Sequence, residues 1–295
     1  MRLVLTLVAA DLSGLEKALP AALEALAQAG RPADGLEVLG EGAADLFVEG
    51  AELAALRASA DRALAMLPID YCVQPADGRR KRLLVADMDS TIIGCECLDE
   101  LADFAGCKAQ VAEVTAKAMA GEIPFESALA ERVALLAGLD LAVLQRAFDE
   151  RVRLNPGAAR LVRTMTAHGA RCVLVSGGFD FFTGRVARAA GFVAHHANRL
   201  IDDGARLTGA VAQPILGREA KLAALRDEAA ALGLQPADVV AIGDGANDLA
   251  MIEAAGLGIA YRAKPLVAAR ADARIDNGDL TAALYFQGIG QEAFA

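Results

Sequence analysis

The chain has 295 residues, 55% of them hydrophobic, and a formal net charge of −10 at pH 7. This length suits one large domain with an insertion or two domains, and the apolar content is sufficient for a sizeable core. The acidic balance disfavours nonspecific binding to nucleic acid or to an anionic membrane, and no uncharged apolar run is long enough to span a bilayer.

The cysteines and the N-terminal residues indicate in which cellular compartment the protein is expected. The cysteine count is five, an odd number, and no C-x-x-C pair occurs. Cys95 and Cys97 offer half of a metal site, but nothing in the sequence supplies the other half. Met1 and Arg2 precede only a short apolar stretch that Asp11 interrupts, which is not the pattern of a signal peptide. We therefore expect reduced thiols and a cytoplasmic protein.

Residues 1–78 have the pattern of a separate small domain. Apolar and leucine-spaced segments predict strands at 3–9, 36–39, 46–48 and 69–73, and helices at 15–29 and 53–66. This βαββαβ order is that of the ferredoxin-like fold. It resembles ACT-type regulatory domains, in which the first strand-to-helix loop, here Asp11-Leu12-Ser13-Gly14, often binds an amino acid. A domain used only for homodimer contacts is the alternative.

A linker follows at residues 75–82, and we expect its basic side chains to be solvated. The apolar run at 83–86 then predicts a strand buried on both faces of a parallel sheet. Asp87 ends this strand, at the edge where open α/β sheets place their ligands, and Asp89 follows one residue later. Two carboxylates so close repel each other unless a cation or a shared proton offsets their charge. Taken alone, the pair also fits an Asp-rich turn.

The next stretch is helical throughout. Helices are predicted at 98–105, 111–120, 125–136 and 141–152, before the next strand at 172–175. Helices alone between two buried strands predict a cap, at about 94–155, inserted after the first strand of the sheet. Its hinges are expected at Gly94 and at Asn155-Pro156-Gly157. Such a cap can exclude water while a substrate is bound.

From residue 158 onward, helices and strands alternate. Further helices are predicted at 158–168, 179–190, 219–232 and 248–255, and further strands at 239–242 and 257–260. Residues 193–211 are predicted to form a hairpin around Asp203-Gly204. The alternation predicts an α/β domain at 79–295, with a doubly wound parallel, Rossmann-like sheet.

Three further signals lie at strand ends or close to them. Ser176-Gly177-Gly178 follows a strand, and such a turn lets the backbone approach an anion. Lys221 is predicted to lie in a helix, where a lone lysine is normally a surface charge. The segment from Gly243 to Asp248, Gly-Asp-Gly-Ala-Asn-Asp, adds carboxylates at another strand end. Carboxylates beside a phosphate are the usual coordination sphere of Mg²⁺.

In this order and context, these motifs resemble those of the haloacid dehalogenase-like phosphohydrolases. Within that superfamily the sequence is most similar to the phosphoserine phosphatase family. The similarity rests on Asp87-Met-Asp-Ser-Thr with Glu96, on Met119-Ala-Gly-Glu-Ile-Pro-Phe125 leading to Arg132, and on the Ser176 and Asp244 motifs. It implies an enzyme that hydrolyses O-phospho-L-serine, the last step of serine biosynthesis.

The resemblance also implies roles for particular residues. Asp87 is the expected nucleophile, which forms an aspartyl-phosphate, and Asp89 is the expected general acid and base. The expected Mg²⁺ ligands are Asp87, the Asp89 carbonyl and Asp244. Groups that hold the phosphoryl oxygens or support the site are expected at Ser176, Gly177, Lys221, Asn247 and Asp248.

For the cap, the resemblance implies that Glu96 binds the substrate ammonium and Arg132 its carboxylate. Met119 and Phe125 are expected to form an apolar wall. Ordinary packing on a helix face is the alternative for all of these residues. A related phosphatase or phosphotransferase acting on a small ester such as homoserine phosphate is the alternative function. A phospho-accepting signalling receiver and an amino-acid sensor are more distant alternatives.

Overall fold

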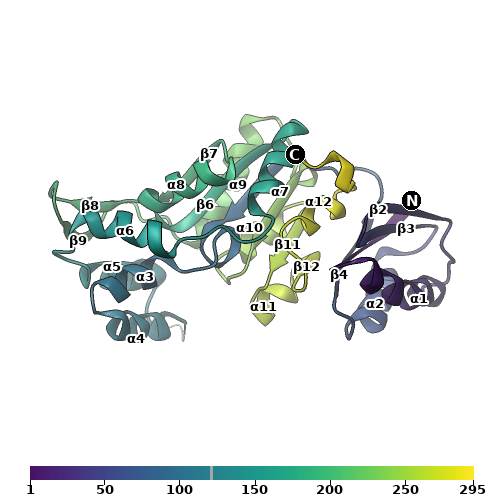
Figure 1. Ribbon diagram of the computed structural model, residues 1–295, viewed down its shortest axis with the longest axis horizontal. Coiled ribbons are helices and arrows are strands. Elements are labelled where there is room, and N and C mark those ends of the chain that lie inside the picture. The colour runs from purple at the N-terminus through teal and green to yellow at the C-terminus, as the bar shows by residue number, and fades with distance from the viewer. Residues whose placement is uncertain (120–121) are drawn as a thin grey trace.

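The structure is a computed structural model that describes residues 1–119 and 122–295, apart from the side chain of Met119 (Figure 1). One ten-stranded sheet runs through it in the order β2-β3-β1-β4-β12-β11-β10-β5-β6-β7. The N-terminal unit lies at one end of the molecule and a group of helices at the other, with the parallel part of the sheet between them (Figure 1). Among the described residues, none of the helices combines the length and hydropathy needed to cross a bilayer.

The N-terminal unit contains the predicted elements in the predicted order. They are β1 Arg2–Ala9, α1 Leu12–Gln28, β2 Gly35–Gly40, β3 Ala43–Glu49, α2 Leu53–Leu64 and β4 Ile69–Pro75. The strands are antiparallel, with β1 between β3 and β4. Leu3, Leu5 and Leu7 of β1 pack with leucines of α1 and α2, so both helices cover the same face of the sheet. The Asp11 carboxylate caps α1 by accepting the N–H of Gly14 at 2.8 Å.

The remaining sheet is parallel and has β5 at its centre. Its strands are β5 Leu83–Asp87, β6 Arg171–Phe179, β7 Ala194–Asn198, β10 Val239–Gly243, β11 Leu257–Tyr261 and β12 Ala273–Ile275. The helices of this part are α7 Ala158–Ala167, α8 Asp180–Ala190, α9 Arg218–Ala231, α10 Leu249–Ala254, α11 Pro265–Ala268 and α12 Ala282–Phe286. Leu84 packs with residues of α7 and α8, and its neighbour Leu83 packs with residues of α9. Helices therefore cover both faces, and the predicted α/β fold is confirmed.

The predicted helices between β5 and β6 are α3 Cys97–Phe104, α4 Lys108–Met119, α5 Phe125–Ala134 and α6 Leu141–Arg151. They lie together at the end of the molecule opposite to the N-terminal unit (Figure 1). Ile93 and Leu154 form an isolated antiparallel bridge where the chain enters and leaves this region. Gly94 and Asn155 flank that bridge, at the predicted hinge positions.

The prediction of one hairpin over 193–211 was wrong in part. Its first residues form β7, which pairs in parallel with β6 at the edge of the large sheet. Only β8 Leu200–Asp202 and β9 Leu207–Val211 form a hairpin, and its backbone bonds to the helical region through Gly138 and Leu139. Alternating residues favour a strand, but they do not determine which partner the strand takes.

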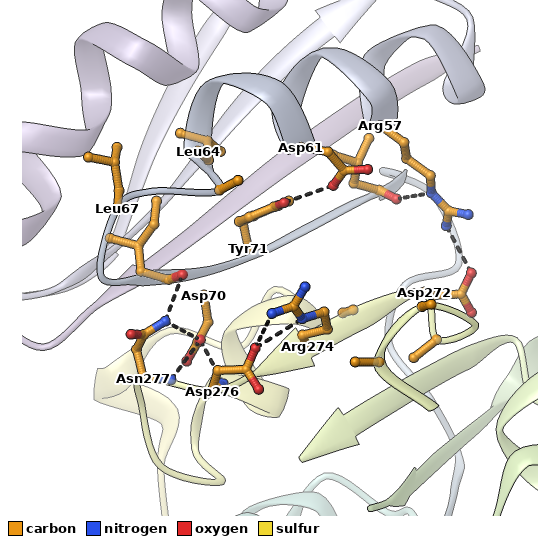
Figure 2. Close-up of a pocket in the computed structure, with 17 residues that line it drawn as sticks. Arg57, Asp61, Leu64, Leu67, Asp70, Tyr71, Asp272, Arg274, Asp276 and Asn277 are labelled. Atoms are coloured by element: carbon orange, nitrogen blue, oxygen red, sulfur yellow. Dashed lines mark hydrogen bonds and ion pairs between the residues drawn. The ribbon is translucent and has the colours of Figure 1, made fainter. Parts of the chain in front are cut away.

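The N-terminal unit joins the parallel sheet edge to edge, through β4 and β12. Asp70 of β4 accepts the backbone N–H groups of Asp276, Asn277 and Gly278 at 2.9, 3.0 and 2.7 Å. Beside this contact lies a cavity of about 320 Å³, lined by both units, in which Arg57 pairs with Asp272 at 3.0 Å (Figure 2).

The prediction of solvated basic charges in the linker was wrong for two of them. Arg79 pairs at 2.6 Å with the buried carboxylate of Asp45. Lys81 is buried, and its ammonium donates to the carbonyls of Gly78 and Ala237 at 3.0 and 2.8 Å. The linker passes between the two units, so residues distant in sequence bury its charges.

We expect Asp70→Ala to lower the free energy of unfolding by roughly 1–3 kcal/mol, because three backbone N–H groups lose a buried, charged acceptor. Chemical denaturation of the full-length protein measures this change. Asp61→Ala is the matched control in the same cavity, since Asp61 is exposed and accepts only from Tyr71 among the contacts described. Equal losses in the two variants would show that Asp70 does not hold the units together.

Candidate active site

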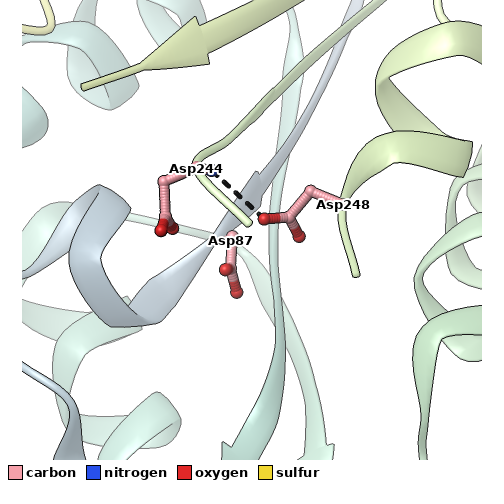
Figure 3. A group of neighbouring side chains, drawn as sticks. All are labelled: Asp87, Asp244 and Asp248. Atoms are coloured by element: carbon pink, nitrogen blue, oxygen red, sulfur yellow. Dashed lines mark hydrogen bonds between the residues drawn. The ribbon is translucent and has the colours of Figure 1, made fainter. Parts of the chain in front are cut away.

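Two neighbouring strand ends of the parallel sheet and the loop after one of them bring the predicted carboxylates together. Asp87 ends β5, and Asp244 directly follows the neighbouring strand β10. Asp248 immediately precedes α10. Their carboxylate oxygens lie within 4.8 Å of one another (Figure 3). The carboxyl ends of adjacent parallel strands meet at one edge of a sheet, which explains why residues far apart in sequence converge here.

Lys221 is buried beside these carboxylates, not on the surface. Its side chain is 2% exposed, and its ammonium lies 2.7 Å from Asp87 and 2.5 Å from Asp248. Burial alone would lower the pKa of Lys221, but the two carboxylates together raise it above its ordinary value. The lysine therefore carries a positive charge into the site.

Asp248 organises the loop after β10. One of its oxygens accepts from Lys221, and the other accepts the N–H groups of Asp244 and Gly245 at 3.1 and 3.0 Å. A Cβ on Gly243 would lie 2.5 Å from the Asp248 side chain, so this position requires glycine. Asp248 therefore supports the site by fixing Asp244 and Lys221.

The cluster has more negative than positive charge. Burial and the neighbouring Asp248 raise the pKa of Asp87, and the same causes raise the pKa of Asp244. Thr91 donates to Asp244 at 3.0 Å, a contact that the sequence analysis did not assign. Hard carboxylate oxygens at this spacing fit a divalent cation such as Mg²⁺, which would offset the excess charge.

Asp89 lies next to this cluster, and its carboxylate is held by two donors. The N–H of Cys97 donates to one oxygen at 2.9 Å, and the hydroxyl of Ser176 donates to the other at 3.0 Å. Burial raises the pKa of Asp89. Among the described residues, the group of carboxylates that could hold a metal is Asp87, Asp244 and Asp248, and the Asp89 carboxylate lies outside it.

The turn after β6 lies beside Asp89. The hydroxyl of Ser176 accepts the N–H of Gly178 at 2.8 Å, and a Cβ on Gly178 would approach Asp89 within 2.9 Å. Asn198, at the end of β7, donates to the Gly177 carbonyl at 2.8 Å and accepts the N–H of Leu216 at 2.7 Å. The sequence analysis missed Asn198, because no motif surrounds it and its partners come from distant loops.

The helical region places its predicted residues on the same side. Phe125 begins α5, and its ring lies 3.3 Å from where a Cβ on Gly177 would be. Glu96 accepts the Ser90 hydroxyl at 2.6 Å, while burial and the Asp89 charge raise the pKa of Glu96 to about 7. Arg132 is half-buried, and burial lowers the pKa of its guanidinium, while the charges of Asp99 and Glu96 act in the opposite direction.

For two other predicted residues, Asn247 and Met119, the structure gives no side-chain contact in the site. Asn247 is half-buried and lies between Asp244 and Asp248 in the sequence of its loop. The side chain of Met119, at the end of α4, lies outside the described part of the structure.

Comparison with known proteins assigns this fold and site to a class. The sequence model of the haloacid dehalogenase-like hydrolases matches residues 84–253, more than half of the chain. The chain belongs to the haloacid dehalogenase-like hydrolase family.

Within this family the chain is similar to proteins named phosphoserine phosphatase. The one from Streptomyces coelicolor is 45% identical over 85% of this chain and 61% of its own length. The one from Polaromonas sp. is 46% identical over 68% of this chain and 86% of its own length. The chain thus spans less than two thirds of the Streptomyces relative.

Solved structures of haloacid dehalogenase-family hydrolases and of phosphoserine phosphatase are also similar to this chain. A haloacid dehalogenase family hydrolase from Salmonella enterica serovar Typhi superposes with a TM-score of 0.83 at 28% identity, over 97% of this chain and 98% of its own. A phospho-aspartyl intermediate analogue of phosphoserine phosphatase superposes with a TM-score of 0.65 at 37% identity, over 70% of this chain and 99% of its own.

Proposed function

We propose that the protein is a Mg²⁺-dependent phosphoserine phosphatase, which hydrolyses O-phospho-L-serine to L-serine and phosphate as the last step of serine biosynthesis. The observation that carries this proposal is the arrangement of the buried Asp87 and Lys221 beside the half-buried Asp89 at one sheet edge. The similarity to phosphoserine phosphatases supports the choice of substrate. The five free cysteines fit a cytoplasmic enzyme.

Asp87 acts as the nucleophile. Its carboxylate attacks phosphorus and forms an aspartyl-phosphate, which divides one difficult displacement into two steps. Lys221, at 2.7 Å from Asp87, is placed to bind the phosphoryl oxygens together with the Ser176 hydroxyl and the Gly177 N–H. Because these donors are held in place before the reaction, they stabilise developing negative charge without reorganising.

Asp89 acts as the general acid and then as the general base. Burial raises the pKa of this carboxyl group, which helps it to hold the proton that the departing serine oxygen requires. The same group, once ionised, takes a proton from the water that hydrolyses the aspartyl-phosphate. Its contacts with Cys97 and Ser176 fix its orientation for both steps.

Asp87, Asp244 and the Asp89 carbonyl would hold the Mg²⁺. Asp248 is a weaker candidate ligand, because its oxygens already accept from Lys221 and from two backbone N–H groups. A cation bound there supplies positive charge that lets a carboxylate approach a phosphate.

The cap residues match the two charged ends of phosphoserine. Glu96 would bind the ammonium and Arg132 the carboxylate, with Phe125 above the phosphoryl site and Met119 completing the apolar wall. The position of the Phe125 ring next to Gly177 supports this assignment. Asn247, in the loop after β10 that carries Asp244 and Asp248, is proposed to support substrate binding.

Arg132→Ala is expected to weaken turnover of O-phosphoserine far more than that of phosphoethanolamine, which lacks the carboxylate. Removing one partner of such a charge pair costs about 2–5 kcal/mol, and the loss should appear in kcat/KM. Phosphoethanolamine is the internal control, because its phosphate and ammonium make the other contacts. Equal losses on both substrates would mean that Arg132 has a structural role.

A panel of small phosphate monoesters, assayed with Mg²⁺ and after chelation, tests the proposed function. O-phosphoserine should be the preferred substrate, and chelation should remove activity that added Mg²⁺ restores. Preference for homoserine phosphate, or transfer of phosphate to an added alcohol, would favour the related phosphatase or phosphotransferase. A stable phosphoprotein without turnover would favour a signalling receiver.

We also infer that residues 1–78 form a ferredoxin-like, ACT-like domain with a regulatory or dimerisation role. The strand order β2-β3-β1-β4, with both helices on one face, supports this inference. The same phosphatase assay with added free amino acids, together with sedimentation of the protein, tests it. No change of rate and a monomer in every condition would contradict both roles.

A further inference from the structure

Asn198 is a buried amide beside the site, and the proposed mechanism does not use it. It ends β7 and is 2% exposed. Its side-chain NH₂ group donates to the carbonyls of Gly177 and Leu216 at 2.8 and 3.1 Å, and its side-chain oxygen accepts the N–H of Leu216 at 2.7 Å. These partners fix the orientation of the amide, because a backbone N–H only donates and a carbonyl only accepts. Asn198 therefore joins two loops through three hydrogen bonds.

The contact with Gly177 fixes a peptide unit that leads to Asp89. The C=O and N–H of a trans peptide point in opposite directions, so holding the Gly177 carbonyl on Asn198 directs the N–H of Gly178 the other way. That N–H donates to the Ser176 hydroxyl oxygen at 2.8 Å, and the same hydroxyl donates to Asp89 at 3.0 Å. Asn198 thus orients Ser176 through the peptide between the two glycines.

The contact with Leu216 fixes the start of the helix that carries Lys221. Leu216 and Gly217 directly precede α9. Between β7 and Leu216 the chain forms the β8–β9 hairpin, and the Asn198 amide closes the base of that excursion. Lys221 lies near the start of α9, with its ammonium 2.7 Å from Asp87. The amide therefore determines where this helix begins relative to the sheet.

The two segments that Asn198 joins also contact the cap at one place. The Phe125 ring lies 3.3 Å from where a Cβ on Gly177 would be, and 3.3 Å from where a Cβ on Gly217 would be. Both glycines adjoin the hydrogen bonds of Asn198. One ring can contact both glycines only if their separation is fixed, and the Asn198 amide fixes it.

We propose that Asn198 is a positioning residue for phosphoryl binding, which sets the spacing between the Gly177 turn and the start of α9. This inference rests on the proposed function. The spacing lets the Ser176 hydroxyl, the Gly177 N–H and the Lys221 ammonium converge on one phosphoryl group. Asn198 does not touch the substrate itself, and it acts through these donors. Misplacement of such groups by about 1 Å can cost about 10²-fold in rate.

Asn198→Ala in the full-length protein tests the proposal. We expect kcat/KM to fall about 10²-fold, and by the same factor with O-phosphoserine, phosphoethanolamine and nitrophenyl phosphate, because the phosphoryl group is common to all three. Asn198→Asp keeps the shape and the acceptor for the Leu216 N–H, but it loses the NH₂ group that donates to Gly177, so it should also lose rate. A loss confined to O-phosphoserine, or unaltered turnover in Asn198→Asp, would overturn the proposal.

Gln287→Ala is the matched control for a purely structural effect. Gln287 is 1% exposed, donates to the Ala283 carbonyl at 2.8 Å and accepts the N–H of Lys81, in the linker, at 3.1 Å. Each alanine variant removes a buried amide that joins two backbone segments, so both should unfold at a lower temperature than the unaltered protein. Only Asn198→Ala should lose rate. Equal rate losses in the two variants would reduce Asn198 to a structural role and overturn the proposal.

Binding of inorganic phosphate, measured by calorimetry with Mg²⁺, tests the positioning role without turnover. Asn198→Ala should weaken this binding about tenfold or more, the value of one hydrogen bond to a charged group, and Gln287→Ala should not change it. An unaltered protein that binds phosphate but hydrolyses no monoester would refute the proposed function, and the phosphate affinities would still decide the role of Asn198. Equal affinities in the three proteins, or no phosphate binding by the unaltered one, would overturn the positioning role.

Discussion

Asp87→Asn is expected to abolish turnover while the fold stays intact, because a neutral amide cannot act as the nucleophile. Loss of a nucleophile lowers kcat by roughly 10⁴–10⁶-fold in enzymes of this kind of covalent mechanism. The amide has nearly the shape of the carboxylate, and Lys221 keeps its contact with Asp248. Turnover of O-phosphoserine with Mg²⁺, together with thermal unfolding, measures both parts of the expectation.

Asp227→Asn is the matched control for this variant. Asp227 lies on the exposed side of α9, the helix that carries Lys221, so the same chemical change there should leave turnover unaltered. Rapid quenching of the unaltered enzyme should trap phosphate on the protein, and Asp87→Asn should trap none. Hydrolysis near the unaltered rate in Asp87→Asn would refute the covalent mechanism.

Asp89→Asn should separate the two roles proposed for Asp89, general acid and general base. A serine alkoxide is a poor leaving group that needs a proton as its P–O bond breaks, whereas a nitrophenolate leaves readily without one. General acid–base assistance is typically worth about 10²–10⁴-fold, so the first step with O-phosphoserine should slow by a factor in that range. With nitrophenyl phosphate the first step should stay fast, while hydrolysis of the aspartyl-phosphate lacks its base.

With nitrophenyl phosphate, the time course of Asp89→Asn should show a burst of nitrophenolate close to one equivalent of enzyme, followed by a slow steady rate. Phosphate should be trapped on Asp87 during the slow phase. The aryl substrate is its own control, since both substrates use the same nucleophile and cation. Absence of a burst, or equal losses in the first step with both substrates, would leave Asp89 only the metal-binding role proposed for its backbone carbonyl.

Much of the sheet and of the site could be predicted because the necessary information is local. The apolar run that ends at Asp87, and the one before Asp244, each specify a buried strand and place a carboxylate at its end. Parallel pairing of neighbouring strands then brings those ends together. Lys221 could be placed there only through the resemblance of the motifs, because its spacing within a helix carries no such signal.

The rest depends on contacts between distant residues. Arg79 and Lys81 have the composition of a solvated linker, but Asp45 and the Ala237 carbonyl accept from them. Asn198 holds the Gly177 turn only because β7 pairs with β6. The same pairing removed residues 194–198 from the predicted hairpin. In each case the sequence determines a propensity, and the tertiary partner determines the outcome.

The junction of β4 with β12 has a consequence for biosynthesis. Edge strands present unpaired N–H and C=O groups that recruit other chains, and β12, with only three residues, would be such an edge without β4. During synthesis β4 emerges long before β12, which is the last strand of the chain. The edge of β4 with which β12 pairs is therefore already made when β12 is synthesised. In a fragment lacking residues 1–78, β12 would be the exposed edge of the parallel sheet.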